Sequence, residues 1–194
     1  MNTLLHCCCG PCLGGSYPIL EKEIGTGKTA VFWENPNIHP YFEYIQRMNS
    51  FIKMSEVYGL KIYKGDVEYG LSRFLNVLGE DYGPSRCEKC YRIRLYATAK
   101  KAAEKGFDSF STTLLISPYQ NHELLQKVGN EVGEENKIKF LYVDFRPGFR
   151  SSHDIIRQYD LYKQKYCGCI FSEYDRYIND KKAKNQLKVT DIGE

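Results

Sequence analysis

The chain alternates between short apolar runs and longer segments in which apolar residues recur every three or four positions. Short runs are typical of buried strands, and the longer spacing is typical of amphipathic helices. The predicted strands cover residues 3–8, 30–33, 61–63, 110–115 and 139–143. The predicted helices cover residues 14–23, 41–58, 87–105, 122–132, 151–159 and 174–179, and residues 69–78 form a helix or an irregular turn. This alternation predicts an α/β fold with a mainly parallel five-stranded sheet flanked by helices.

The length of 194 residues is within the usual size of one domain. We expect a single α/β domain over residues 1–180 and a polar basic tail over residues 181–194, which holds four lysines. No apolar run approaches the roughly 20 residues of a membrane helix, and no secretory signal pattern is visible. The expectation is a cytoplasmic protein without a membrane partner.

Half of the eight cysteines lie in one heptapeptide, HCCCGPC, at residues 6–12, directly after the first predicted strand. The others form two close pairs, Cys87 with Cys90 and Cys167 with Cys169. Disulfide scaffolds spread their cysteines along small, loop-rich secreted chains, whereas these cysteines are bunched in a chain with regular helix and strand patterns. The distribution therefore favours metal or redox chemistry.

The chemistry of such thiols has several possible forms. A Cys-x-x-Cys pair alone serves zinc sites, iron–sulfur clusters and dithiol couples alike. Two adjacent cysteines of the first loop with Cys87 and Cys90 would supply four thiolates for a [4Fe-4S] cluster. That set would leave Cys12, and the pair Cys167 and Cys169, for a second metal or a redox-active dithiol.

The position of each thiol narrows these choices. Neighbouring side chains of a strand point to opposite faces, so one thiol of the triplet should face the core, and we assign that place to Cys7. Cys87 and Cys90 lie on the first turn of a long predicted helix, whose positive dipole end favours thiolates. The carboxyl end of the first strand is also where ligands bind in open parallel sheets.

Charge and aromatic content permit a nucleic-acid partner without requiring one. The formal net charge is only +3, from 27 basic and 24 acidic residues. Tyrosines are interleaved with arginines and lysines at residues 91–96 and 159–166, and such surfaces can stack bases and hold phosphates. Half-buried structural tyrosines are an equally good interpretation of composition alone.

Six motifs occur in order along nearly the whole chain, from about residue 3 to 172. They are HxCCxPC at 6–12, NPNIHP at 35–40, RCxxC at 86–90, TTL at 112–114, DF at 144–145 and YCGC at 166–169. Together they resemble the QueH family, the epoxyqueuosine reductases of transfer-RNA queuosine synthesis. The resemblance implies a Rossmann-like (HUP-type) fold, with the cysteine loop where related nucleotide hydrolases bind phosphate, and an iron–sulfur oxidoreductase.

The resemblance also implies roles for single residues. It places the cluster ligands on Cys8, Cys9, Cys87 and Cys90, and a redox pair on Cys167 and Cys169. Cys12 is a further candidate metal ligand, for a second mononuclear iron or zinc. Tyr119 departs from the family pattern, because we expect a histidine there in many members.

The implied reaction removes an epoxide oxygen and leaves a cyclopentene, which requires two electrons and two protons and releases water. Three residues are candidate proton donors: His39, Tyr166 and Asp144. The implied partners are the anticodon stem-loop of a transfer RNA carrying epoxyqueuosine at its wobble position, and an external electron donor.

Rival functions require features that are missing or different here. An ATP-dependent tRNA sulfur-transfer enzyme of related fold needs a glycine-rich phosphate loop after the first strand, where this chain has cysteines. The segment GTGK at residues 25–28 lacks the Walker spacing and precedes a strand, so we interpret it as a turn. A non-catalytic zinc-binding RNA module would be colourless. A radical S-adenosylmethionine enzyme would need a different cysteine spacing.

Overall fold

The computed structural model describes residues 1–65, 69–178 and 180, and it contains a five-stranded sheet. The strands are β1 (Thr3–His6), β2 (Thr29–Trp33), β3 (Ile62–Lys64), β4 (Ser109–Thr112) and β5 (Lys139–Phe140). Their order is β3-β2-β1-β4-β5, and every neighbouring pair is parallel. The predicted α/β architecture with a parallel sheet is confirmed, and β1 lies at its centre.

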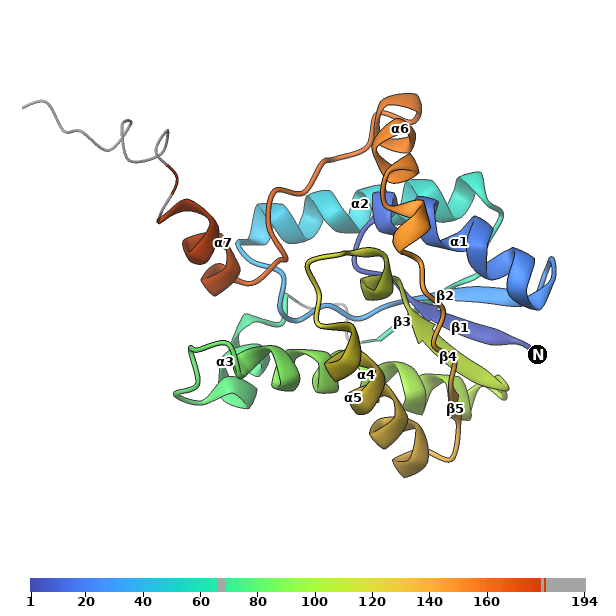
Figure 1. Ribbon diagram of the computed structural model, residues 1–194, viewed down its shortest axis with the longest axis horizontal. Coiled ribbons are helices and arrows are strands. Elements are labelled where there is room, and N and C mark those ends of the chain that lie inside the picture. Colours follow the sequence, from blue (N-terminus) through green and yellow to red (C-terminus); the bar gives the residue numbers. More distant parts are fainter. Residues whose placement is uncertain (66–68, 179, 181–194) are drawn as a thin grey trace, which may run out of the picture.

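Helices cover both faces of this sheet (Figure 1). They are α1 (Gly10–Ile24), α2 (Tyr41–Val57), α3 (Leu71–Leu78), α4 (Arg86–Glu104), α5 (His122–Glu135), α6 (Ser151–Gln158) and α7 (Ile170–Tyr177). In Figure 1, α1 and α2 lie on one side of the strands, with α4 and α5 on the other. No helix of the described residues is long and apolar enough to cross a membrane.

The central strand is buried on both faces, which explains its continuous apolar sequence. Leu4 and Leu5 point to opposite faces of the sheet and both are fully buried. Directly after β1, Gly10 lets α1 approach α2 closely, because a Cβ there would meet the Ser50 carbonyl oxygen at 2.2 Å. The turn into α1 is thereby held against the core.

Several boundaries differ from the sequence-based expectation. The first strand ends at His6 instead of residue 8, and α1 begins at Gly10 instead of residue 14, because Cys9 caps it. The fourth strand ends at Thr112 instead of continuing to residue 115, because the Thr112 hydroxyl accepts a hydrogen bond from the Leu114 amide and starts a short 3-10 helix, Thr113–Ile116. The fifth strand has only two residues, and α7 begins at Ile170 instead of residue 174 because Cys169 caps it. The turn at residues 25–28 is confirmed; the predicted tail, residues 181–194, lies outside the described residues.

Candidate metal and redox site

The first group of thiols lies at the corner between β1 and α1, residues 7–12. Cys9 caps α1, since its sulfur accepts a hydrogen bond from the Cys12 amide at 3.3 Å, and Pro11 fits the first turn. The sulfur atoms of Cys8, Cys9 and Cys12 all lie within 4.8 Å of one another, and all three residues are buried. The corner therefore offers three converging soft ligands.

Cys7 belongs to the core and not to this group. Its side chain is fully buried, and its thiol donates to the Leu5 carbonyl at 3.4 Å. Burial raises the pKa of Cys7 well above its usual value, which keeps it a neutral thiol. The placement of Cys7 predicted from strand alternation agrees with the structure.

The three converging thiols differ in protonation. Hydrogen bonds from Cys12 and then Cys9, aided by Thr113, hold the pKa of Cys8 well below its usual value despite burial. The same bonds and burial raise the pKa of Cys12, while burial raises that of Cys9. Cys8 is therefore the most readily deprotonated thiol of the corner, and a thiolate is the form that binds metal.

The second group of thiols comes from two distant segments. Cys87 and Cys90 are on the first turn of α4, and Cys167 and Cys169 are on the strap, which we define as residues 161–169 between α6 and α7. Cys90 and Cys169 are both buried in one apolar cluster, beside Phe74. Burial raises the pKa of Cys90 to about 12, against the opposing charge of Arg94.

Two buried guanidinium groups lie among these thiols. Arg94 is 1% exposed, donates to the Cys90 sulfur at 3.1 Å, and its charge also acts on Cys167 and Cys8. No carboxylate of the described chain forms an ion pair with Arg94. Arg47 is fully buried, and its charge acts on Cys9 and Cys8.

A buried cation without a carboxylate needs another source of negative charge. The acidic groups around Arg94 are the thiols of Cys90, Cys167 and Cys8 and the phenol of Tyr91. An anionic thiolate-ligated metal centre meets this requirement, so the donor set fits a soft-metal cofactor. The guanidinium groups of Arg94 and Arg47 thus supply positive charge for an anionic cofactor.

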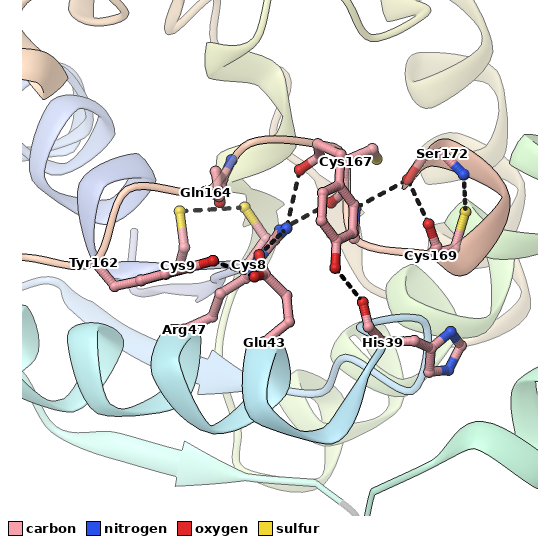
Figure 2. Close-up of polar contacts among 12 residues, drawn as sticks. Cys8, Cys9, His39, Glu43, Arg47, Tyr162, Gln164, Cys167, Cys169 and Ser172 are labelled. Atoms are coloured by element: carbon pink, nitrogen blue, oxygen red, sulfur yellow. Dashed lines mark hydrogen bonds and ion pairs between the residues drawn. The ribbon is translucent and has the colours of Figure 1, made fainter. Parts of the chain in front are cut away.

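Arg47 also holds the strap in position (Figure 2). It forms an ion pair with Glu43 at 2.6 Å and donates to the backbone carbonyls of Tyr166 and Cys167, both at 2.9 Å. Tyr162 donates to the second oxygen of Glu43. Helix α2 therefore clamps the strap by one buried network.

Between the corner and the strap lies a cavity of about 890 Å³. Three cysteines from the two groups line it, namely Cys8, Cys12 and Cys167. Its wall also includes aromatic and basic side chains: Tyr119, Phe149, His153, Lys163, Lys165, Tyr166 and Arg176. The volume is in the range of small-molecule sites, so a nucleobase-sized ligand fits beside the sulfurs.

Comparison with known proteins identifies the family of the chain. The family model described as epoxyqueuosine reductase QueH matches residues 3–175. This chain belongs to the QueH family. Curated relatives named epoxyqueuosine reductase QueH include one from Dehalococcoides mccartyi, 35% identical over 91% of this chain and 94% of the relative. Another, from Thermotoga maritima, is 32% identical over 90% of this chain and 92% of the relative.

Of the three candidate proton donors named from the sequence, only Tyr166 lines the cavity. His39 is buried with its ring against Tyr69 and Phe74, and burial lowers its pKa to about 4. Asp144 pairs with Arg146, whose hydrogen bond lowers the pKa of Asp144. The structure thus separates the three candidates.

Three polar residues of this QueH site were missed by the sequence reasoning: Arg47, Gln120 and Gln164. Arg94 was expected to add positive charge near Cys87 and Cys90, and it follows Cys90 by one helical turn and so shares its face. The two glutamines donate to sulfur, Gln120 to Cys167 at 3.3 Å and Gln164 to Cys12 at 3.7 Å. No local pattern in the sequence indicates those contacts.

Proposed function

We propose that this protein is an epoxyqueuosine reductase, which converts epoxyqueuosine in transfer RNA to queuosine by a two-electron deoxygenation. Membership of the QueH family supports the activity. The observation that carries the proposal is the cavity of about 890 Å³ whose wall joins thiols of both cysteine groups. A reducible substrate bound in this cavity would lie against sulfur.

In this proposal, a [4Fe-4S] cluster is held by Cys8, Cys9, Cys87 and Cys90. The thiolate character of Cys8 and the two buried arginines support an anionic cofactor. Cys12 is close enough to Cys8 and Cys9 to help bind a second metal, iron or zinc. When bound, the cofactor supplies single electrons and Lewis acidity.

Cys167 and Cys169 are proposed as the dithiol that stores two electrons. The two thiols release two electrons and two protons and close a disulfide. The epoxide loses its oxygen as water, and its two carbons become joined by a double bond. An external reductant then reopens the disulfide. Because Cys167 lines the cavity, the couple has direct access to the bound substrate.

Tyr166 is the proposed proton donor for the departing oxygen. Burial raises the pKa of its phenol, so the proton is present at neutral pH. The hydroxyl donates to the His39 carbonyl at 2.5 Å, which fixes the ring. Asp144 and His39 are less suited, because neither lines the cavity.

The proposed partner is the anticodon stem-loop. Its modified base would leave the stack and enter the cavity, as bases do in other enzymes that act on them. Tyr119 and Phe149, with ring centroids 6.1 Å apart, supply aromatic surface on the cavity wall. Lys163 and Lys165 supply positive charge for phosphates on the same wall.

The activity is tested with anaerobically purified protein, a chemical reductant and transfer RNA that carries epoxyqueuosine. Nucleoside mass spectrometry should show loss of one oxygen and formation of queuosine, without ATP. ATP-dependent incorporation of sulfur into the RNA would instead indicate the sulfur-transfer alternative. Binding of the RNA without any change of the nucleoside would refute the reductase assignment.

A further inference from the structure

The two thiols of the strap have different surroundings. Cys167 is half-buried and lines the cavity, whereas Cys169 is 7% exposed and lies outside the cavity wall. A soluble reductant that enters the cavity therefore meets the Cys167 sulfur first. The two sulfurs of the pair therefore differ in their accessibility from the cavity.

Cys167 also has a dedicated hydrogen-bond partner. The Gln120 amide nitrogen donates to its sulfur at 3.3 Å, and the Gln120 carbonyl oxygen accepts from the Tyr91 hydroxyl at 2.6 Å. A hydroxyl that donates to the amide oxygen leaves the amide N–H turned towards the sulfur.

Cys169 is placed to be a leaving group. Its sulfur accepts from the Ser172 amide at 3.4 Å at the start of α7, and the Arg86 guanidinium lies beside it. An amide N–H and a cation both stabilise a thiolate as it is released. In the disulfide, attack on Cys167 with departure of Cys169 is then the favoured direction.

We propose that Cys167 is the thiol of the pair that exchanges with the external reductant, and that Tyr91 and Gln120 are its positioning residues. This rests on the proposed redox role of the pair. A dithiol reductant attacks the Cys167 sulfur, the bond between the two strap sulfurs breaks, and Cys169 leaves as a thiolate. The second thiol of the reductant then displaces Cys167, so the reductant becomes a disulfide and the strap a dithiol.

The first experiment maps alkylation of the reduced, metal-loaded protein by limiting iodoacetamide under anaerobic conditions. Peptide mass spectrometry should find Cys167 labelled before Cys169. Gln120→Leu should slow labelling of Cys167 by about tenfold, the size expected for losing a hydrogen bond to a charged group. Tyr91→Phe should give a smaller decrease, because the amide remains but is free to turn.

Gln126→Leu is the matched control, since that glutamine is exposed on α5 and lies outside the cavity wall. It should leave the Cys167 labelling rate unchanged. Should Gln120→Leu disturb folding, Gln120→Glu keeps the size and the bond from Tyr91 but replaces the N–H by an oxygen, and it should slow labelling as well. The inference would be overturned if Cys169 were labelled first, or if the rate of Cys167 labelling were the same in both Gln120 variants as in the unchanged protein.

The second experiment equilibrates the protein with glutathione buffers and measures the fraction of Cys167–Cys169 disulfide. Because Gln120 stabilises the reduced form, Gln120→Leu should shift the equilibrium towards the disulfide by about tenfold, or about 30 mV for a two-electron couple. If no such disulfide forms at any ratio while Cys167 labelling still depends on Gln120, the positioning role stands and the proposed redox role fails.

Discussion

The corner and the strap hold thiols in opposite ways. The corner brings Cys8, Cys9 and Cys12 together within one turn of chain, where their sulfurs share hydrogen bonds and burial. The strap carries Cys167 and Cys169 on an irregular segment held by side chains of other elements, above all Arg47. A locally built group suits a resident cofactor, whereas a clamped segment beside a cavity suits a couple that opens and closes.

The largest expected effect is that of Cys8→Ser at the corner. Cys8 is the most readily deprotonated thiol of the corner and lines the cavity, so its loss should remove bound iron, the visible absorption and all turnover. Iron and sulfide analysis with the deoxygenation assay measures this. If the Cys8→Ser protein kept its iron, Cys8 would not be a ligand of the cofactor.

The strap should behave differently when its thiols are changed. Cys167→Ser and Cys169→Ser should abolish turnover while the visible spectrum and the iron content remain, because the pair is proposed to store electrons and not to bind the cluster. Single-turnover and multiple-turnover assays on each variant test this. Full activity in either variant would make that thiol a bystander.

A third effect concerns the clamp on the strap. Arg47→Met leaves the Glu43 carboxylate buried without its partner, so the free energy of unfolding should fall by about 3–5 kcal/mol. Urea unfolding of the anaerobic protein measures it. The double change Arg47→Met with Glu43→Gln should recover part of the loss, and a single-variant loss below about 1 kcal/mol would contradict the clamp.

A smaller effect is expected from pH. Burial lowers the pKa of His39 from 6.5 to about 4, so unfolded chains bind a proton more readily than folded ones. Its contribution to stability is present above pH 6.5 and is lost as the pH falls towards about 4. His39→Gln should therefore flatten the pH dependence of unfolding across that window. An unchanged slope would show that His39 does not contribute.

The smallest effect should come from Cys7→Ser. Cys7 lies in the core and donates only to the Leu5 carbonyl, so iron content and turnover should stay near those of the unchanged protein. Comparing Cys7→Ser with Cys8→Ser, one residue away, distinguishes the loss of a metal ligand from a change in core packing. If Cys7→Ser folded normally but lost its iron, Cys7 would be a cofactor ligand and not a core residue.

The corner could be predicted from sequence because its geometry is local. Strand alternation identifies Cys7 as the core member of the triplet. The start of α1 at Gly10, four residues before the predicted helix, was not foreseen. The parallel order of the sheet was readable from alternating strand and helix patterns. Thr112 shows the limit, since its hydroxyl accepts a hydrogen bond from the Leu114 amide and thereby ends the strand early.

The strap could not be predicted in the same way. Arg47 reaches carbonyls 119 and 120 residues away, and Gln120 reaches a sulfur 47 residues away. Such contacts depend on how α2 and the strap meet in three dimensions, and no spacing in the sequence reports that. For the same reason, His39 was a plausible proton donor by motif but lies away from the cavity wall.

The most direct test is to compare iron content and visible absorption in two variants prepared side by side, Cys87→Ser and Cys169→Ser. Cys87 and Cys169 lie in the same group of thiols, and their charges act on each other, yet the account gives them different tasks. It predicts that Cys87→Ser loses the cluster absorption while Cys169→Ser keeps it. Full iron and absorption in Cys87→Ser, or their loss in Cys169→Ser, would contradict the division between cofactor ligands and redox couple.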